Sequence, residues 1–237
     1  MLDNNEHRAA MYRLLVGIFR DPYLSAVLGF KGGTACYFFH DLPRFSVDLD
    51  FDIISKGDAS VRDKIYERVE RIVKEEGFIL KDGYIKHNTV FLLASYDKEK
   101  HNIKIEISGR DFPNTYEAKN FYGLQANVLV KADMFAHKLV AAMERKKTAL
   151  RDIFDIWFFF KNGWPINGEM VKLRTGKKLK SYLKDLKSFI QEKIGDRPVL
   201  GDLGSVLNDK TKAWVKAKLK KELIGLLDFY IDKQDGD

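Results

Sequence analysis

The stretch KGGTACYFFHDLPRFSVDLDFDI, residues 31–53, joins a glycine pair to a run in which acidic and apolar residues alternate. Alternate side chains of a β-strand point to opposite faces, so a strand over residues 47–54 would place Asp48, Asp50 and Asp52 on one face and apolar residues on the other. Carboxylates this close together repel one another unless a cation lies among them. Magnesium suits such a site, because it takes one or two carboxylates and completes its shell with water and phosphate oxygens.

The acidic run has two other interpretations. D-x-D-x-D also opens an EF-hand calcium loop. That loop would need glycine where this chain has Ile53 and glutamate where it has Ala59, and strand formers separate the aspartates, so an EF-hand is excluded. An exposed edge strand whose charges prevent aggregation remains the structural alternative.

A third acidic residue is predicted to join the first two. Residues 103–108 alternate in the same way, with isoleucines on one face and Lys104 and Glu106 on the other. If this strand lies beside the first, Glu106 comes within reach of Asp48 and Asp50, and three carboxylates can hold two metal ions about 4 Å apart. The alternative for Glu106 is a surface charge in a hairpin.

The glycine pair supplies a candidate phosphate site. Gly32 and Gly33 allow a close approach of the main chain to a ligand, and a helix over residues 30–39 would direct free N–H groups and its positive dipole end at a triphosphate. Thr34 adds a hydroxyl group. The G-x-x-x-x-G-K-[ST] loop is missing from the sequence, so a P-loop NTPase is excluded.

Hydrophobic periodicity predicts an α+β protein with an N-terminal α/β domain, residues 1–120, and a C-terminal helical domain, residues 121–237. The expected helices cover residues 6–20, 30–39, 61–77, 131–145 and 149–161, followed by a helical tail. The expected strands cover residues 47–54, 90–96 and 103–108, and the last two form an antiparallel hairpin around the polar loop 97–102.

The order of these features, a glycine pair that opens a helix, D-x-D on a strand and a third acid on a neighbouring strand, resembles the nucleotidyltransferase superfamily of DNA polymerase β. More narrowly, FKGGTACYFFHDLPRFSVDLDF is similar to the first motif of the AbiEii-type nucleotidyltransferase toxins. The R-x-S-x-D-x-D-F strand of that family is matched by Arg44, Ser46, Asp48, Asp50 and Phe51.

A second AbiEii motif, a lysine-bearing helix followed by R-D-x-x-D, resembles HKLVAAMERKKTALRDIFDIW at residues 137–157. The matching positions are Lys138, Arg151, Asp152 and Asp155. Without the resemblance, the acids would be explained by the preference of a helix N-terminus for negative charge, and Lys138 by solvation.

The resemblance implies a nucleotidyltransferase-type mixed or antiparallel sheet with flanking helices, completed by the C-terminal helices. It also implies a role for each matching position. The expected nucleotide-binding residues are Gly32, Gly33, Thr34, Ser46 and Lys138. The expected metal ligands are Asp48, Asp50 and Glu106, and the expected catalytic set is Asp48, Asp50, Glu106, Lys138 and Asp152, with Asp155 as an alternative to Asp152.

Positive charge is concentrated in one segment. Residues 171–221 contain 15 Lys and Arg against 5 Asp and Glu, whereas the whole chain has a net charge of +7. Such a segment is typical of a surface that binds a polyanion, and RNA is the first candidate for the basic region, residues 172–221. Solvated lysines on helix faces are the structural alternative.

Together these features predict a Mg²⁺-dependent enzyme, with Mn²⁺ as an alternative ion, that transfers a nucleoside monophosphate from an NTP to an acceptor hydroxyl. RNA, and tRNA in particular, is the favoured acceptor because family members modify tRNA, and the resemblance implies a toxin with a cognate antitoxin. A protein or small-molecule acceptor, or a non-catalytic RNA-binding module, are the alternatives. The N-terminus resembles neither a signal peptide nor a membrane span, and a single cysteine, Cys36, fits a reducing compartment, so a cytoplasmic location is expected.

Overall fold

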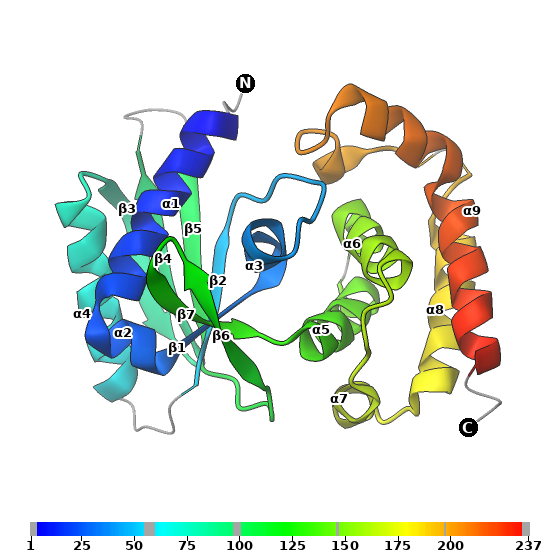
Figure 1. Cartoon of the computed structure of the whole chain (residues 1–237), viewed down its shortest axis with the longest axis horizontal. Coiled ribbons are helices and arrows are strands. Elements are labelled where there is room, and N and C mark those ends of the chain that lie inside the picture. Colours follow the sequence, from blue (N-terminus) through cyan, green and yellow to red (C-terminus); the bar gives the residue numbers. More distant parts are fainter. Residues whose placement is uncertain (1–3, 55–59, 97–100, 146, 197, 234–237) are drawn as a thin grey trace. The chain divides into compact units, whose positions relative to one another are not determined.

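The computed structural model describes residues 4–54, 60–96, 101–145, 147–196 and 198–233 (Figure 1). The chain divides into two compact units. The first comprises Met1–Asp41 and Phe45–Leu129, and the second comprises Leu42–Arg44 and Val130–Asp237.

The first unit is built on a seven-stranded sheet with the order β3-β4-β5-β2-β1-β7-β6. Its strands are β1 (Leu28–Lys31), β2 (Leu49–Ile53), β3 (Ile79–Lys86), β4 (Thr89–Ser95), β5 (Asn102–Ser108), β6 (Tyr116–Phe121) and β7 (Leu124–Leu129). The pairs β1–β7 and β2–β5 are parallel and the others are antiparallel, so the mixed sheet expected from the sequence is confirmed.

The helices that accompany this sheet in the described part of the unit are α1 (Asn4–Arg20), α2 (Pro22–Val27), α3 (Gly32–Phe39) and α4 (Ser60–Glu75). α4 packs on β3 and β4, α1 packs on β7, and α3 packs on β1 and β2 (Figure 1). The apolar face of β2 is the centre of the core, because Leu49 and Phe51 are fully buried and Phe51 packs against Phe19 and Phe30. Cys36, the single cysteine of the sequence, is buried in α3.

Several sequence predictions need correction in this unit. The helix expected over residues 30–39 begins only at Gly32, because Phe30 and Lys31 belong to the short strand β1. Strands β1, β3, β6 and β7 were not predicted. β1 has only four residues, and the outer strand β3 is largely exposed, so neither has a clear period-two pattern of burial. The β4–β5 hairpin is confirmed, although residues 97–100 of its loop lie outside the described residues.

The second unit is helical. Its helices are α5 (Lys131–Glu144), α6 (Leu150–Lys161), α7 (Gly168–Thr175), α8 (Leu179–Lys193), the short 3-10 helix η1 (Gly201–Leu203) and α9 (Asp209–Lys233). Aromatic side chains hold them together: Phe135 of α5 packs on Phe160 of α6, and Trp157 of α6 packs on Trp214 of α9. The α+β class is confirmed, and β7 extends the first unit to Leu129, past the boundary expected at residue 120. Among the described residues, no helix is long and apolar enough to cross a membrane.

Candidate functional site

Gly32 lies against the carboxylate of Asp50. The main chain of Gly32 has φ +78°, and a Cβ at this position would lie 2.5 Å from Asp50 Oδ2. A side chain is therefore disfavoured twice, by the left-handed backbone and by the clash. The structure thus brings the start of α3 and the acidic face of β2 together, as the sequence suggested, and leaves no side chain between them.

Thr34 and Ser46 hold the segment that leads into β2. The fully buried Thr34 hydroxyl is hydrogen-bonded to the hydroxyl of Ser46 at 2.9 Å and to the main-chain carbonyl oxygen of Asp48. The Thr34 hydroxyl is thus occupied by the protein, and the main-chain N–H groups of Gly33 and Thr34 lie in the first turn of α3, where a helix leaves such groups without partners inside the helix.

His7 supports the same segment from α1, although no pattern in the sequence singled it out. Its Nε2 donates a hydrogen bond to the carbonyl oxygen of Val47 at 3.0 Å, so Nδ1 accepts from the hydroxyl of Tyr96 at 2.9 Å. Burial lowers the pKa of His7, despite the opposing effects of Val47 and Asp48. A neutral imidazole of one tautomer therefore fixes the main chain directly before Asp48.

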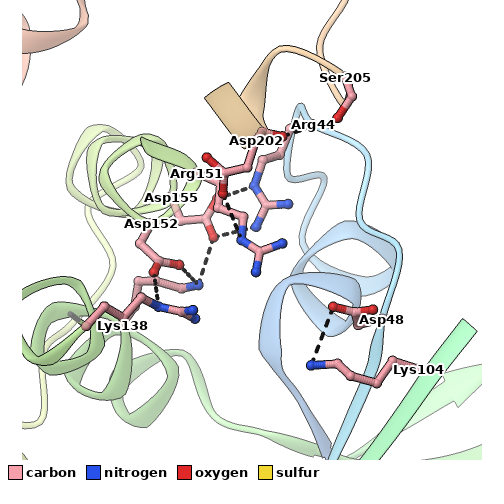
Figure 2. Close-up of polar contacts among 10 residues, drawn as sticks. Arg44, Asp48, Lys104, Lys138, Arg151, Asp152, Asp155, Asp202 and Ser205 are labelled. Carbon is pink, nitrogen blue, oxygen red and sulfur yellow. Dashed lines mark hydrogen bonds and ion pairs between the residues drawn. The ribbon is translucent and has the colours of Figure 1, made fainter. Parts of the chain in front are cut away.

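The acidic face of β2 meets a third carboxylate on β5. The parallel register of the two strands places Asp50 opposite Glu106. The prediction that these strands lie side by side is confirmed. Lys104 Nζ lies 3.7 Å from Asp48 Oδ2 and 3.3 Å from Glu106 Oε2 (Figure 2 shows the contact with Asp48). The acidic face thus carries a cation of its own.

The charges on this face shift one another's protonation. Burial raises the pKa of Asp50, and the Asp48 and Glu106 carboxylates raise it further against the opposing effect of Lys104. Burial alone would lower the pKa of Lys104, but Asp48, Asp50 and Glu106 outweigh it and raise that pKa. The carboxylates are therefore a site that favours positive charge.

These residues fit a divalent ion by their chemistry. Their donors are carboxylate oxygens, which Mg²⁺ and Mn²⁺ prefer, and the ammonium of Lys104 already lies beside two of them. Within the described residues, no three His, Cys, Asp or Glu side chains are grouped closely enough to hold a metal ion. In this structure Asp48 and Glu106 are paired with Lys104, whose ammonium supplies the positive charge.

Asp52 shares the face but has a different environment. Its carboxylate forms an ion pair with Lys31 and accepts hydrogen bonds from Asn114 Nδ2 at 3.1 Å and the Tyr116 hydroxyl at 2.8 Å. The residue is only 2% exposed. Asp52 therefore anchors Lys31, the residue before the glycine pair, and its oxygens are occupied by the protein.

The second motif forms an ion-pair cluster within the helical unit. Lys138 of α5 lies between two aspartates of α6, with Nζ 2.9 Å from Asp152 Oδ1 and 3.0 Å from Asp155 Oδ2 (Figure 2). Burial and the nearby Arg44 would each lower the pKa of Lys138. The carboxylates of Asp152 and Asp155 outweigh both effects and raise that pKa well above its usual range. Lys138 is thus held as an ammonium.

Arg44 completes this cluster with a bidentate ion pair. Its Nε and Nη2 donate to Oδ1 and Oδ2 of Asp155 at 2.5 and 2.6 Å, and both side chains are buried. The tripeptide Leu42–Arg44 belongs by its contacts to the helical unit, although its neighbours on both sides belong to the first unit. Arg44 belongs to the first AbiEii motif and Asp155 to the second, but the sequence did not indicate that these two residues pair.

Asp152 differs from Asp155 in its second oxygen. Asp152 Oδ2 is buried and lies 2.7 Å from Arg145 Nε, but it accepts no hydrogen bond from the described residues. Burial would raise the pKa of Asp152, yet Lys138 and Arg145 outweigh it and lower that pKa. Asp152 is therefore an ionised carboxylate with one oxygen on Lys138 and one without a hydrogen bond.

The basic region follows α7, α8 and α9. Part of its charge is neutralised locally, since Lys177 pairs with Asp185, Lys187 with Asp228 and Lys220 with Asp196. Other lysines on α9 are exposed to solvent: Lys210, Lys216, Lys218 and Lys221. These helices thus present positive charge at the surface.

A family model described as the nucleotidyl transferase AbiEii toxin of type IV toxin–antitoxin systems matches residues 13–218. The chain belongs to the AbiEii family. The resemblance noted in the two motifs is therefore confirmed, and the match extends to residue 218, well past the second motif, which ends at residue 157. As a member of the AbiEii family, the protein is a nucleotidyltransferase of a toxin type.

Solved structures share this AbiEii-type fold along almost the whole chain. A nucleotidyltransferase candidate from H. pylori is 24% identical with a TM-score of 0.60, covering 98% of this chain and 96% of that one. JHP933 from Helicobacter pylori is 24% identical with a TM-score of 0.58, covering 98% and 95%. The nucleotidyltransferase toxin MenT4 from Mycobacterium tuberculosis is 18% identical with a TM-score of 0.58, covering 98% and 86%. No curated protein matches the sequence.

Proposed function

We propose that the protein is a Mg²⁺-dependent toxin that transfers a nucleoside monophosphate from an NTP to a hydroxyl group of RNA, with tRNA as the favoured acceptor and the cytoplasm as the place of reaction. The observation that carries this proposal is the group of three carboxylates around one cation: Asp48 directly before β2, Asp50 on β2 and Glu106 on β5 surround Lys104, and the start of α3 at Gly32 lies against Asp50.

Asp48, Asp50 and Glu106 would hold the metal ions, which neutralise triphosphate charge when bound. The main-chain N–H groups at Gly33 and Thr34 would receive phosphate oxygens at the start of α3. Lys138 would donate to the phosphates as an ammonium. The acceptor oxygen attacks the α-phosphorus, the bond between that phosphorus and the bridging oxygen of the leaving group breaks, the hydroxyl proton passes to Glu106, and pyrophosphate leaves.

Asp152 has a separate place in this proposal. Its Oδ1 accepts from Lys138, and its Oδ2 is buried and lies 2.7 Å from Arg145 Nε, so the protein itself holds both oxygens. Asp152 would therefore serve the active site as the carboxylate that orients Lys138.

The basic region supports RNA as the acceptor, because exposed lysines on α9 can contact phosphates of a polyanion. The type IV toxin–antitoxin family further supports a cognate antitoxin as the partner that controls this activity.

One experiment tests the reaction. The protein is incubated with each α-³²P-labelled NTP, Mg²⁺ or Mn²⁺ and total RNA, beside an Asp48→Ala/Asp50→Ala variant. We expect one NTP to label an RNA band with the wild type only. Label on RNA from both proteins, or no transfer to any acceptor with any NTP, would contradict the proposal.

A protein or small-molecule acceptor is the second candidate, and the local pairing of Lys177, Lys187 and Lys220 with acidic residues favours it, because it reduces the charge available to RNA. Label that appears on protein or in the soluble fraction, and not on RNA, would support this candidate. The non-catalytic module considered from the sequence is not retained, since the chain belongs to a nucleotidyltransferase family.

A further inference from the structure

Asp155 has no oxygen left for a metal ion or substrate. Oδ1 accepts from Arg44 Nε at 2.5 Å, and Oδ2 accepts from Arg44 Nη2 at 2.6 Å while it lies 3.0 Å from Lys138 Nζ. The side chain of Asp155 is 0% exposed. The second acid of R-D-x-x-D is therefore occupied on both oxygens by cations of the protein.

Lys138 is oriented by this arrangement. A lysine ammonium has three N–H donors, and two of them are directed at Asp152 and Asp155. The third donor is then fixed in direction, because rotation about the Cε–Nζ bond would break both ion pairs. The Lys138 side chain is 16% exposed, whereas the side chains of Asp152 and Asp155 are 1% and 0% exposed, so a ligand would reach these three residues through Lys138.

Arg44 in turn fixes Asp155. A bidentate guanidinium holds the plane of a carboxylate, which a lysine cannot do in the same way. Removing Arg44 would leave Asp155 with Lys138 alone, and removing Asp155 would take the bidentate acceptor from a buried guanidinium, so the remaining side chain could turn in either case.

We propose that Arg44 and Asp155 are positioning residues for nucleotide binding, which hold the Lys138 ammonium so that its third donor meets a phosphate oxygen of the NTP. This inference rests on the proposed phosphate-binding role of Lys138. In this arrangement Asp152 and Asp155 both act through Lys138, and Arg44 is the residue that fixes Asp155.

A double-mutant cycle tests the proposal. The dissociation constants of α,β-methylene analogues of the four common NTPs are measured by calorimetry with Mg²⁺ for four variants: Asp155→Asn, Arg44→Lys, Lys138→Met and Lys138→Met/Asp155→Asn. We expect Asp155→Asn and Arg44→Lys to weaken binding about tenfold, since loss of orientation at a bound phosphate has effects of this order. Lys138→Met should weaken nucleotide binding at least as much. The double variant should bind the nucleotide with the same affinity as Lys138→Met alone.

The matched control is Asp21→Asn. Asp21 also pairs with arginines, at 2.8 Å from Arg68 and 3.1 Å from Arg71, but it caps α2 in the other unit. Its removal disturbs a partly buried ion pair without touching Lys138. Nucleotide affinity should be unchanged in this variant, and circular dichroism should show that all variants are folded.

The outcomes separate the two proposals. If Lys138→Met leaves the affinity unchanged, the proposed phosphate-binding role of Lys138 fails. If Lys138→Met weakens binding but Asp155→Asn does not, or if the double variant is additively weaker, the positioning role fails. If Asp155→Asn does not fold, Arg44→Lys decides the question, because it keeps a positive charge on Asp155 and loses only the bidentate geometry.

Discussion

Gly32 and Asp50 are in close contact, and a Cβ on Gly32 would lie 2.5 Å from Asp50 Oδ2 and 3.0 Å from Asp50 Cβ. The contact joins the first residue of α3 to the middle of β2, and it accounts for the glycine by space as well as by its φ of +78°. The position of the proposed metal-binding acid is thus coupled to the start of the proposed phosphate-binding helix.

Gly32→Ala is therefore expected to lower the rate of nucleotide transfer about a hundredfold, because Asp50 must move out of place. It should also cost about 1–3 kcal/mol of stability for the left-handed backbone. Activity assays and thermal unfolding measure the two effects. Gly123→Ala is the control, since Gly123 has φ +89° and, apart from its chain neighbours, no atom of the described residues lies within 4 Å of its Cβ position. Equal activity of both variants would contradict the importance of the contact.

Lys104→Met is expected to increase the affinity for Mn²⁺ about tenfold, because the ammonium that balances Asp48 and Glu106 is removed. The same change should lower the melting temperature of the metal-free protein, and added Mn²⁺ should restore it. Calorimetry and thermal unfolding provide the measurements. Lys119→Met is the control, because Lys119 pairs with Glu117 on β6. Unchanged or weaker Mn²⁺ binding in Lys104→Met would show that Lys104 does not compete with the ion.

Asp21→Asn is expected to lower the free energy of unfolding by about 1–2 kcal/mol at pH 7, since the charged hydrogen bonds from Arg68 are removed. Burial would raise the pKa of Asp21, but the N–H groups of α2 and Arg68 outweigh it and hold that pKa below its ordinary value. A carboxyl group whose pKa is lower in the folded state stabilises the fold when the pH is above its unfolded-state pKa. This stabilisation disappears as the pH falls through the folded-state pKa. Denaturant unfolding from about pH 7 to about pH 2 should show the two proteins converge as the pH falls below about 3.8. A difference that persists at the acidic end would contradict the ionic explanation.

Local patterns in the sequence predicted the acidic face well. The structure fully buries Leu49, Phe51 and the isoleucines that flank Glu106, as the alternation predicted. Val47 and Ile53 are only half-buried, and the strand expected over residues 47–54 covers only Leu49–Ile53, so Asp48 lies directly before it. That the two strands are neighbours was an inference from the carboxylates, and the register Asp50–Glu106 confirms it.

Contacts between distant residues could not be predicted in the same way. Arg44 and Asp155 are 111 residues apart in sequence, and each has a plausible local explanation as a surface charge. Lys104 was assigned only to a strand face, since its ion pairs depend on the rotamers of three other residues. Part of β1 was assigned to a helix because four residues are too few to show a period.

Replacement of Lys216, Lys218 and Lys221 with glutamine is expected to weaken RNA binding and to make it less dependent on salt. These lysines are exposed on α9, and each lysine–phosphate ion pair that is removed should reduce the slope of log K against log salt by about 0.7–0.9. Filter binding between about 50 and 200 mM salt, the range in which such ion pairs matter, measures this slope. The control replaces three exposed lysines of the first unit, Lys74, Lys81 and Lys86, and changes the net charge equally. Because net charge alone would affect both variants alike, an equal loss of affinity in the control would show that the basic region is not the RNA-binding surface.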